Sequence, residues 1–272
     1  ESVEKSFIPK ALSIIMLASI FSALLGPNIA NFNKDLINGH LYVGSYLSLA
    51  VLTSIPIIFL SFYSPKTEPV DVKEYKGRSY FELILQPKFL QAVASAAFAY
   101  AVMSFLMTAT PINMHVMEHY SLNKTGIVIQ LHIVSMFLPS LITGNLIKKF
   151  GHSKIIYAGV ALYILTILLS FLEPSFFNYI LALVFLGLGW NFLYLSGTGL
   201  LVLSYREEEK YKAQGFNDVL VFSIQALASL SAGYMLNITS WKAMNLITIP
   251  FLVLIIFSSI RADLSKDGKL KN

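Results

Sequence analysis

One histidine lies deep inside an uncharged stretch of this sequence and would titrate near neutral pH. His132 is in Thr125–Ile147, a run without Asp, Glu, Lys or Arg. Ser135, Pro139 and Thr143 follow it at helical spacing, so a helix would place all four residues on one face. With an ordinary pKa of about 6.5, this imidazole is suited to binding and releasing a proton. The alternative is a neutral histidine hydrogen-bonded to a neighbouring helix, and both interpretations stay open.

Aromatic rings and an amide form a second candidate site. Within Pro174–Tyr205, Asn191 and Tyr194 share a helical face, and Trp190 lies beside them. Such a face suits a planar or amphipathic small molecule. The alternative is an interfacial aromatic pair with a structural asparagine. Gln130 belongs to the same stretch as the histidine but faces elsewhere, toward either packing or the ligand cavity.

Three further candidates lie in two other regions. Met107 and Asn113 are in the outer half of Phe89–Met117, where helix packing is the alternative to ligand contact. Asp218 immediately precedes Val219–Trp241. It would either carry a proton or cap the N-terminus of the following helix, where a carboxylate is favoured.

The residue patterns of an enzyme are weak in this sequence. The absence of Cys excludes thiolate nucleophiles and iron–sulfur clusters. The acidic run Glu207–Glu209 is typical of a solvated face. His115 and His119 have the i, i+4 spacing of a metal pair, but no third ligand is evident. We therefore expect no catalytic residue, no bound metal and no cofactor.

The elements that must position the candidate residues are apolar throughout. Hydrophobic residues make up 56% of the chain and charged residues 13%, which is too apolar for a soluble domain. A helix needs about 20 mostly apolar residues to span a bilayer. Eight uncharged runs approach or exceed that length: Ala11–Asn33, Leu36–Pro65, Phe89–Met117, Thr125–Ile147, Ile155–Leu172, Pro174–Tyr205, Val219–Trp241 and Ala243–Ile260. We predict an all-α membrane protein with eight transmembrane helices.

The 20 basic residues fall mostly on one side once these runs are treated as spans. With the N-terminus in the cytoplasm, 17 lie in cytoplasmic segments, and three, Lys34, Lys124 and Lys242, lie outside. This distribution follows the positive-inside rule. It explains the net charge of +5 by topology and by anionic lipid headgroups of the bilayer, so nucleic-acid binding is not expected. Both termini are predicted to be cytoplasmic, in a multi-pass membrane protein.

A short basic turn resembles a signature of the major facilitator superfamily. That motif reads Gly-x-x-x-Asp-Arg-x-Gly-Arg-Arg/Lys and joins adjacent helices on the cytoplasmic side. Gly144 and Gly151 match its two glycines, and Lys149 matches its first arginine. Lys148 replaces the aspartate, and His152 replaces the next basic residue. The resemblance implies a structural and gating role for this turn.

Other segments extend the resemblance over the chain. Gly26 and Pro27 resemble the Gly-Pro motif in the fifth helix of antiporter-type members. Three strings, at residues 107–114, 128–134 and 136–140, are similar to a bacterial subgroup that includes riboflavin transporters. The resemblance implies that the eight runs are helices five to twelve of a twelve-helix carrier. The first four helices, and with them most of the N-terminal half, would then be missing from this sequence.

The resemblance also implies a domain organisation. Residues 1–63 would hold the last two helices of the N-terminal half, and residues 64–88 the central cytoplasmic loop. A complete C-terminal six-helix half would occupy residues 89–261, followed by a cytoplasmic tail at 262–272. The expected function is secondary active transport of a small organic solute by alternating access, as a symporter or antiporter. A membrane-embedded enzyme or a non-transporting scaffold is the alternative.

Overall fold

A computed structural model describes residues 8–62 and 77–266, and every regular element within these ranges is helical. Predictions for residues 1–7, 63–76 and 267–272, including much of the central loop and of the tail, lie outside the described residues. The chain divides into two compact units. One is Ala18–Lys76, and the other is Gly77–Asn272 taken with Glu1–Leu17.

The smaller unit is a helical hairpin. Helix α1 (Ile8–Phe32), which belongs to this unit from Ala18 on, is joined by a polar turn to helix α2 (Val43–Ser61). The Asn33 side chain donates a hydrogen bond to Ser48 Oγ at 2.8 Å across this turn. Gly44 is required there, because a Cβ at that position would lie 2.1 Å from the Asn33 carbonyl oxygen. The close approach of the turn to the start of α2 therefore depends on a residue without a side chain.

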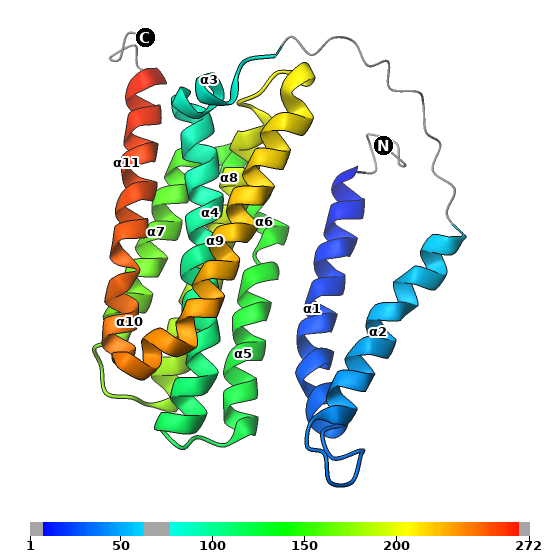
Figure 1. The fold of residues 1–272 in the computed structure, drawn as a ribbon. Helices are drawn as coiled ribbons and strands as arrows, with labels where there is room; N and C mark the ends of the chain where they lie inside the picture. Colours follow the sequence, from blue (N-terminus) through cyan, green and yellow to red (C-terminus); the bar gives the residue numbers. More distant parts are fainter. Residues whose placement is uncertain (1–7, 63–76, 267–272) are drawn as a thin grey trace. The chain divides into compact units, whose positions relative to one another are not determined.

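The larger unit is a bundle of helices packed along one another (Figure 1). In chain order it contains α3 (Tyr80–Leu85), α4 (Pro87–Ile112), the π-helical turn η1 (Asn113–Met117), α5 (Leu122–Phe137), α6 (Ser140–Phe150), α7 (His152–Leu169), α8 (Phe176–Val202), the 3-10 turn η2 (Glu207–Glu209), α9 (Lys210–Ile238), α10 (Trp241–Ile247) and α11 (Ile249–Lys266). Helix α4 packs against α8, α9 and α11, and α8 also packs against α5 and α7.

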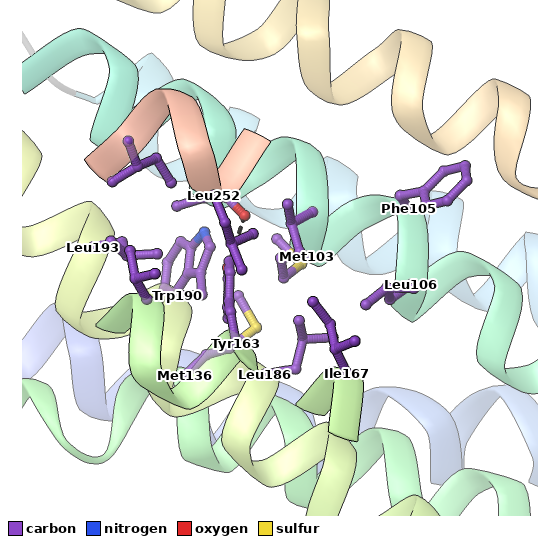
Figure 2. Close-up of a cluster of buried hydrophobic side chains, with 14 of the residues drawn as sticks. Met103, Phe105, Leu106, Met136, Tyr163, Ile167, Leu186, Trp190, Leu193 and Leu252 are labelled. Carbon is purple, nitrogen blue, oxygen red and sulfur yellow. Dashed lines mark hydrogen bonds between the residues drawn. The ribbon is translucent and has the colours of Figure 1, made fainter. Parts of the chain in front are cut away.

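Small residues explain the central place of α4. Its buried positions are rich in alanine, which allows neighbouring backbones to approach closely. At the crossing with α8, a Cβ on Gly197 would lie 2.8 Å from the Ala92 carbonyl oxygen. Larger side chains from α4, α5, α7, α8 and α11 fill the interior, and Figure 2 shows Trp190 in this core with Leu193 on one side and Tyr163 on the other.

The all-helical membrane architecture agrees with the sequence prediction. Six segments of the described chain are long and apolar enough to cross a membrane, and there are seven if the bent pair α5–α6 is counted as one span. The six are Val43–Ser61, Pro87–Met117, His152–Leu169, Phe176–Val202, Glu207–Ile238 and Trp241–Ser265. The number eight stays a prediction.

Two expectations about the region before α9 are wrong. Asp218 does not cap a helix, because α9 begins at Lys210 and Asp218 lies in its third turn. An uncharged run marks the apolar part of a helix, whereas the helix itself can begin among charged residues. Nor is the whole acidic run Glu207–Glu209 solvated, because Glu209 is fully buried in an ion pair with Arg78.

The segment before α4 forms a short helix, α3. Ser79 accepts a hydrogen bond from the Glu82 backbone N–H, while the Glu82 carboxylate accepts one from the Ser79 N–H. This reciprocal capping box fixes the start of α3. Leu83 is buried, whereas Tyr80 and Phe81 are exposed. The short helix is therefore amphipathic.

Candidate functional site

Five aromatic side chains from four helices form the most distinctive cluster in the larger unit. This aromatic cluster consists of Tyr100 on α4, Phe137 on α5, Trp190 and Tyr194 on α8, and Phe222 on α9. Trp190 and Tyr194 are one helical turn apart, and their rings are stacked with centroids 4.9 Å apart and an interplanar angle of 14°. Tyr100 presents its edge to both rings, at 5.1 and 5.0 Å.

The aromatic cluster runs from the core to an exposed rim. Trp190 is only 3% exposed, and Phe137 contacts it at a centroid distance of 5.9 Å. Tyr100 and Tyr194 are half-buried, and Phe222, 6.3 Å from Tyr100, is 57% exposed. Trp190 Nε1 is buried and has no acceptor among the described residues. Two accessible tyrosines with an indole N–H behind them are suited to holding a planar molecule.

A carboxylate stands at the exposed rim. Asp218 precedes Phe222 by one turn of α9 and is exposed. It accepts a hydrogen bond from Asn217 Nδ2 at 3.1 Å and interacts electrostatically with the Tyr194 phenol. The structure therefore brings Asp218 to the cluster.

His132 makes an interhelical contact. The ring is fully buried on α5, and Nδ1 lies 2.7 Å from the Leu183 carbonyl oxygen on α8. Because a carbonyl only accepts, Nδ1 must carry the proton in this contact. Nε2 is buried and has no partner among the described residues. This is the hydrogen bond that the neutral interpretation predicts, and it leaves Nε2 as the ring atom able to take up a proton.

Asn191 faces away from the aromatic cluster. Its Nδ2 donates to the Met136 carbonyl at 2.7 Å and to Ser140 Oγ at 2.6 Å. Its Oδ1 lies 2.7 Å from Thr143 Oγ1. Although Asn191 and Tyr194 are three residues apart, the amide is directed at the junction of α5 and α6. Sequence reasoning missed this partner, and the signal that could have found it is Pro139, which breaks the helix there.

The remaining ligand candidates lie apart from the cluster. Asn113, at the end of α4, donates to the Tyr179 hydroxyl at 2.5 Å. Met107 is half-buried against the hydrophobic core, and Gln130 is half-buried on α5. The structure therefore gathers Trp190, Tyr194 and Asp218 but not these three residues.

The basic turn joins α6 to α7. Gly151 has φ +83°, a conformation that favours glycine, and it reverses the chain there. His152 Nδ1 lies 3.1 Å from the Ser196 carbonyl of α8. Lys148 and Lys149 are exposed at the end of α6.

The other motif glycines have open surroundings. A Cβ on Gly144 would meet no atom within 4 Å, and the same is true of Gly26, which with Pro27 lies on α1 in the smaller unit.

The proposed histidine pair does not share a helix face. His115 lies in the π-helical turn η1, with Nδ1 2.7 Å from the Tyr120 carbonyl oxygen. His119 lies beyond that turn with φ 56°. Within residues 8–62 and 77–266, no group of three His, Cys, Asp or Glu side chains is placed to hold a metal ion.

The chain matches a known protein family and several of its members. The model described as Major Facilitator Superfamily matches residues 93–271. The riboflavin transporter RfnT of Brucella anthropi is 34% identical over 91% of this chain and 62% of its own length. The uncharacterized MFS-type transporters YddS and YdeG of Bacillus subtilis are 29% and 28% identical over 87% of the chain and 58% and 59% of their own lengths. The chain thus spans about three-fifths of each of these relatives.

Proposed function

The chain belongs to the Major Facilitator Superfamily, and from this premise we propose that it forms part of a secondary active transporter for a planar organic solute. The names of its relatives point to a transporter rather than an enzyme. In the proposal, the larger unit supplies one six-helix half, and the solute site is exposed alternately to the two sides of the membrane. The greater length of the relatives supports further helices in the intact carrier.

The aromatic cluster carries the proposal for the solute. Offset-stacked and edge-to-face ring pairs contribute about 0.5–1.5 kcal/mol beyond their burial. A planar solute can take the place of one such contact on the half-buried faces of Tyr100 and Tyr194. Riboflavin has a flat, three-ring heteroaromatic system with carbonyl acceptors, and a relative at 34% identity is named as a riboflavin transporter. We therefore propose a flavin, with riboflavin as the first solute to test.

Asp218 is the better candidate for proton coupling. It is a carboxylate exposed at the rim of the aromatic cluster. His132 is fully buried with Nδ1 engaged, which favours a structural role. Cytoplasmic termini and a bacterial inner membrane are proposed from the distribution of the 20 basic residues and from the bacterial relatives.

The proposal is tested by riboflavin binding to the purified intact carrier, followed by quenching of flavin fluorescence. Tyr194→Leu removes one ring of the stacked pair and should weaken binding about tenfold, equivalent to about 1.4 kcal/mol. Phe177→Leu is the matched control, because Phe177 is an exposed aromatic residue near the other end of α8. Absence of binding by the wild type, or equal effects of both substitutions, would overturn the proposal.

A further inference from the structure

Helices α5 and α6 form one bent segment, with an angle of 42° between them. The last regular bond of α5 runs from Leu138 N to the Val134 carbonyl, at 2.8 Å. Pro139 has no N–H, so the usual donor to the Ser135 carbonyl is missing. The next turn restarts with Leu141 N donating to the Leu138 carbonyl at 3.3 Å. The break leaves carbonyls of the last α5 turn in need of donors from elsewhere.

Asn191 of α8 supplies such a donor. Its Nδ2 gives one hydrogen to the Met136 carbonyl and the other to Ser140 Oγ, so it bonds to both sides of the break. The Thr143 hydroxyl shares its proton between Asn191 Oδ1 at 2.7 Å and the Pro139 carbonyl at 2.8 Å. Asn191 and Thr143 are fully buried. We call Asn191, Met136, Ser140 and Thr143 the asparagine staple.

The asparagine staple adjoins the aromatic cluster on both helices, α5 and α8. Phe137 follows Met136, and Trp190 precedes Asn191. The rings of Phe137 and Trp190 are in contact at 5.9 Å with an interplanar angle of 71°. Two neighbouring residues of α8 therefore hold two neighbouring residues of α5, one pair through a backbone hydrogen bond and the other through ring packing.

We propose that Asn191 is a positioning residue for the solute site: by holding the Met136 carbonyl across the α5–α6 break, it sets the Phe137 ring against Trp190. The link to solute binding rests on the proposed function. The position of the Trp190 ring is a property of the protein without solute, so it can be measured independently.

The chemistry of the staple calls for an amide. Met136 O and Ser140 Oγ both accept from Nδ2, whereas the Thr143 hydroxyl needs an acceptor in Oδ1. Asn191→Asp would direct a second acceptor at the Met136 carbonyl, and Asn191→Leu keeps the branching and the number of heavy atoms but removes every hydrogen bond of the side chain. Either change weakens or removes the hydrogen bonds that connect α8 to the α5–α6 break.

Tryptophan fluorescence reads the position of the ring. This chain has two tryptophans, so Trp241→Phe leaves Trp190 as its fluorescent residue. Any tryptophan elsewhere in the intact carrier is also replaced by phenylalanine. In that background, Asn191→Leu should shift the Trp190 emission to longer wavelength and raise its quenching by acrylamide. Riboflavin Kd should rise about tenfold, with the maximal transport rate per folded molecule changed much less.

Thr166→Val is the matched control. Thr166 is a buried residue of α7 whose hydroxyl lies 3.1 Å from the Ala182 carbonyl of α8, two turns from Trp190. It should leave the Trp190 emission and quenching unchanged. If Asn191→Leu fails to fold, the milder pair Ser140→Ala and Thr143→Val should give a smaller shift in the same direction.

The outcomes separate the two proposals. Equal emission and quenching for Asn191→Leu and Thr166→Val would overturn the positioning role, whatever happens to transport. A shifted Trp190 signal in a carrier that binds no riboflavin would retain the positioning role and reject the proposed solute.

Discussion

Arg78 and Glu209 lie 131 residues apart in the sequence and form a bidentate ion pair. Arg78 Nε donates to Oε1 at 2.8 Å and Nη2 to Oε2 at 2.7 Å. The Arg78 and Arg206 backbone N–H groups add bonds of 2.9 Å to the same carboxylate. Glu209 is fully buried, and its hydrogen bond raises the pKa of Arg78 above its ordinary value. The pair ties the segment before α3 to the start of α9.

Removal of one partner should destabilise the larger unit. Arg78→Met leaves the buried Glu209 carboxylate without its counter-ion, and the free energy of unfolding should fall by about 3 kcal/mol. This is the low end of the range for buried pairs, because the Arg78 side chain is 25% exposed. Thermal unfolding in detergent measures the loss. Arg206→Met is the control, since the Arg206 side chain is exposed and only its backbone bonds to Glu209. Equal melting temperatures for both variants would contradict the role of the pair.

The stability of the first turn of α3 should fall at acid pH, because it depends on the Glu82 carboxylate. Hydrogen bonds from the Ser79 backbone and side chain lower the pKa of this carboxyl. A lowered folded pKa means that the stabilisation is present above the unfolded value and is lost as pH falls through the folded value. Amide hydrogen exchange of residues 79–85 should therefore quicken, relative to α4, in acid below the ordinary glutamate pKa.

Glu82→Gln keeps an acceptor for the Ser79 N–H but cannot ionise. In this variant, the exchange of residues 79–85 relative to α4 should no longer depend on pH in the same range. An acid dependence that persists in Glu82→Gln would show that another group controls α3.

The contact between α5 and α8 should not tolerate a side chain at Gly187. A Cβ there would lie 2.1 Å from Ser135 Oγ and 2.6 Å from the His132 carbonyl oxygen. Gly187→Ala should lower stability by about 1–3 kcal/mol through overpacking. Gly126→Ala on α5 is the control, because nothing lies within 4 Å of its Cβ position and alanine favours a helix. A Gly187→Ala protein as stable as Gly126→Ala would contradict the packing.

Proton dependence should distinguish Asp218 from His132. Asp218→Asn removes the exposed carboxylate at the aromatic cluster and should flatten the pH profile of solute uptake. His132→Asn shortens a side chain whose Nδ1 bonds to Leu183, so it should lower thermal stability while the shape of the pH profile is kept. Uptake by reconstituted carrier over a range of pH makes the comparison. The reverse pattern would assign the proton to His132.

The membrane helices could be predicted from sequence because uncharged length is a local property. Phe89–Met117 and Pro174–Tyr205 nearly coincide with α4–η1 and α8. The start of α9 could not be predicted in this way, because its first turns carry charged residues such as Lys210 and Lys212.

The candidate site was only partly predictable. Tyr194 was expected to share a helical face with Asn191, with Trp190 beside them, but in the structure Tyr194 stacks on Trp190 and the Asn191 amide is directed at the α5–α6 junction. The direction of Asn191 depends on about 100° of rotation from its neighbour and on the break at Pro139 in another helix. The partnership of Arg78 with Glu209 joins segments whose approach is set by the packed bundle. Such contacts are fixed by tertiary packing and leave no local pattern.

Riboflavin uptake by the purified intact carrier in sealed proteoliposomes tests the proposed function most directly. The wild type and Phe177→Leu should accumulate riboflavin, and Tyr194→Leu should require about tenfold more solute for half-maximal uptake. No uptake by the wild type, or identical uptake by all three proteins, would contradict transport of a flavin through the aromatic cluster.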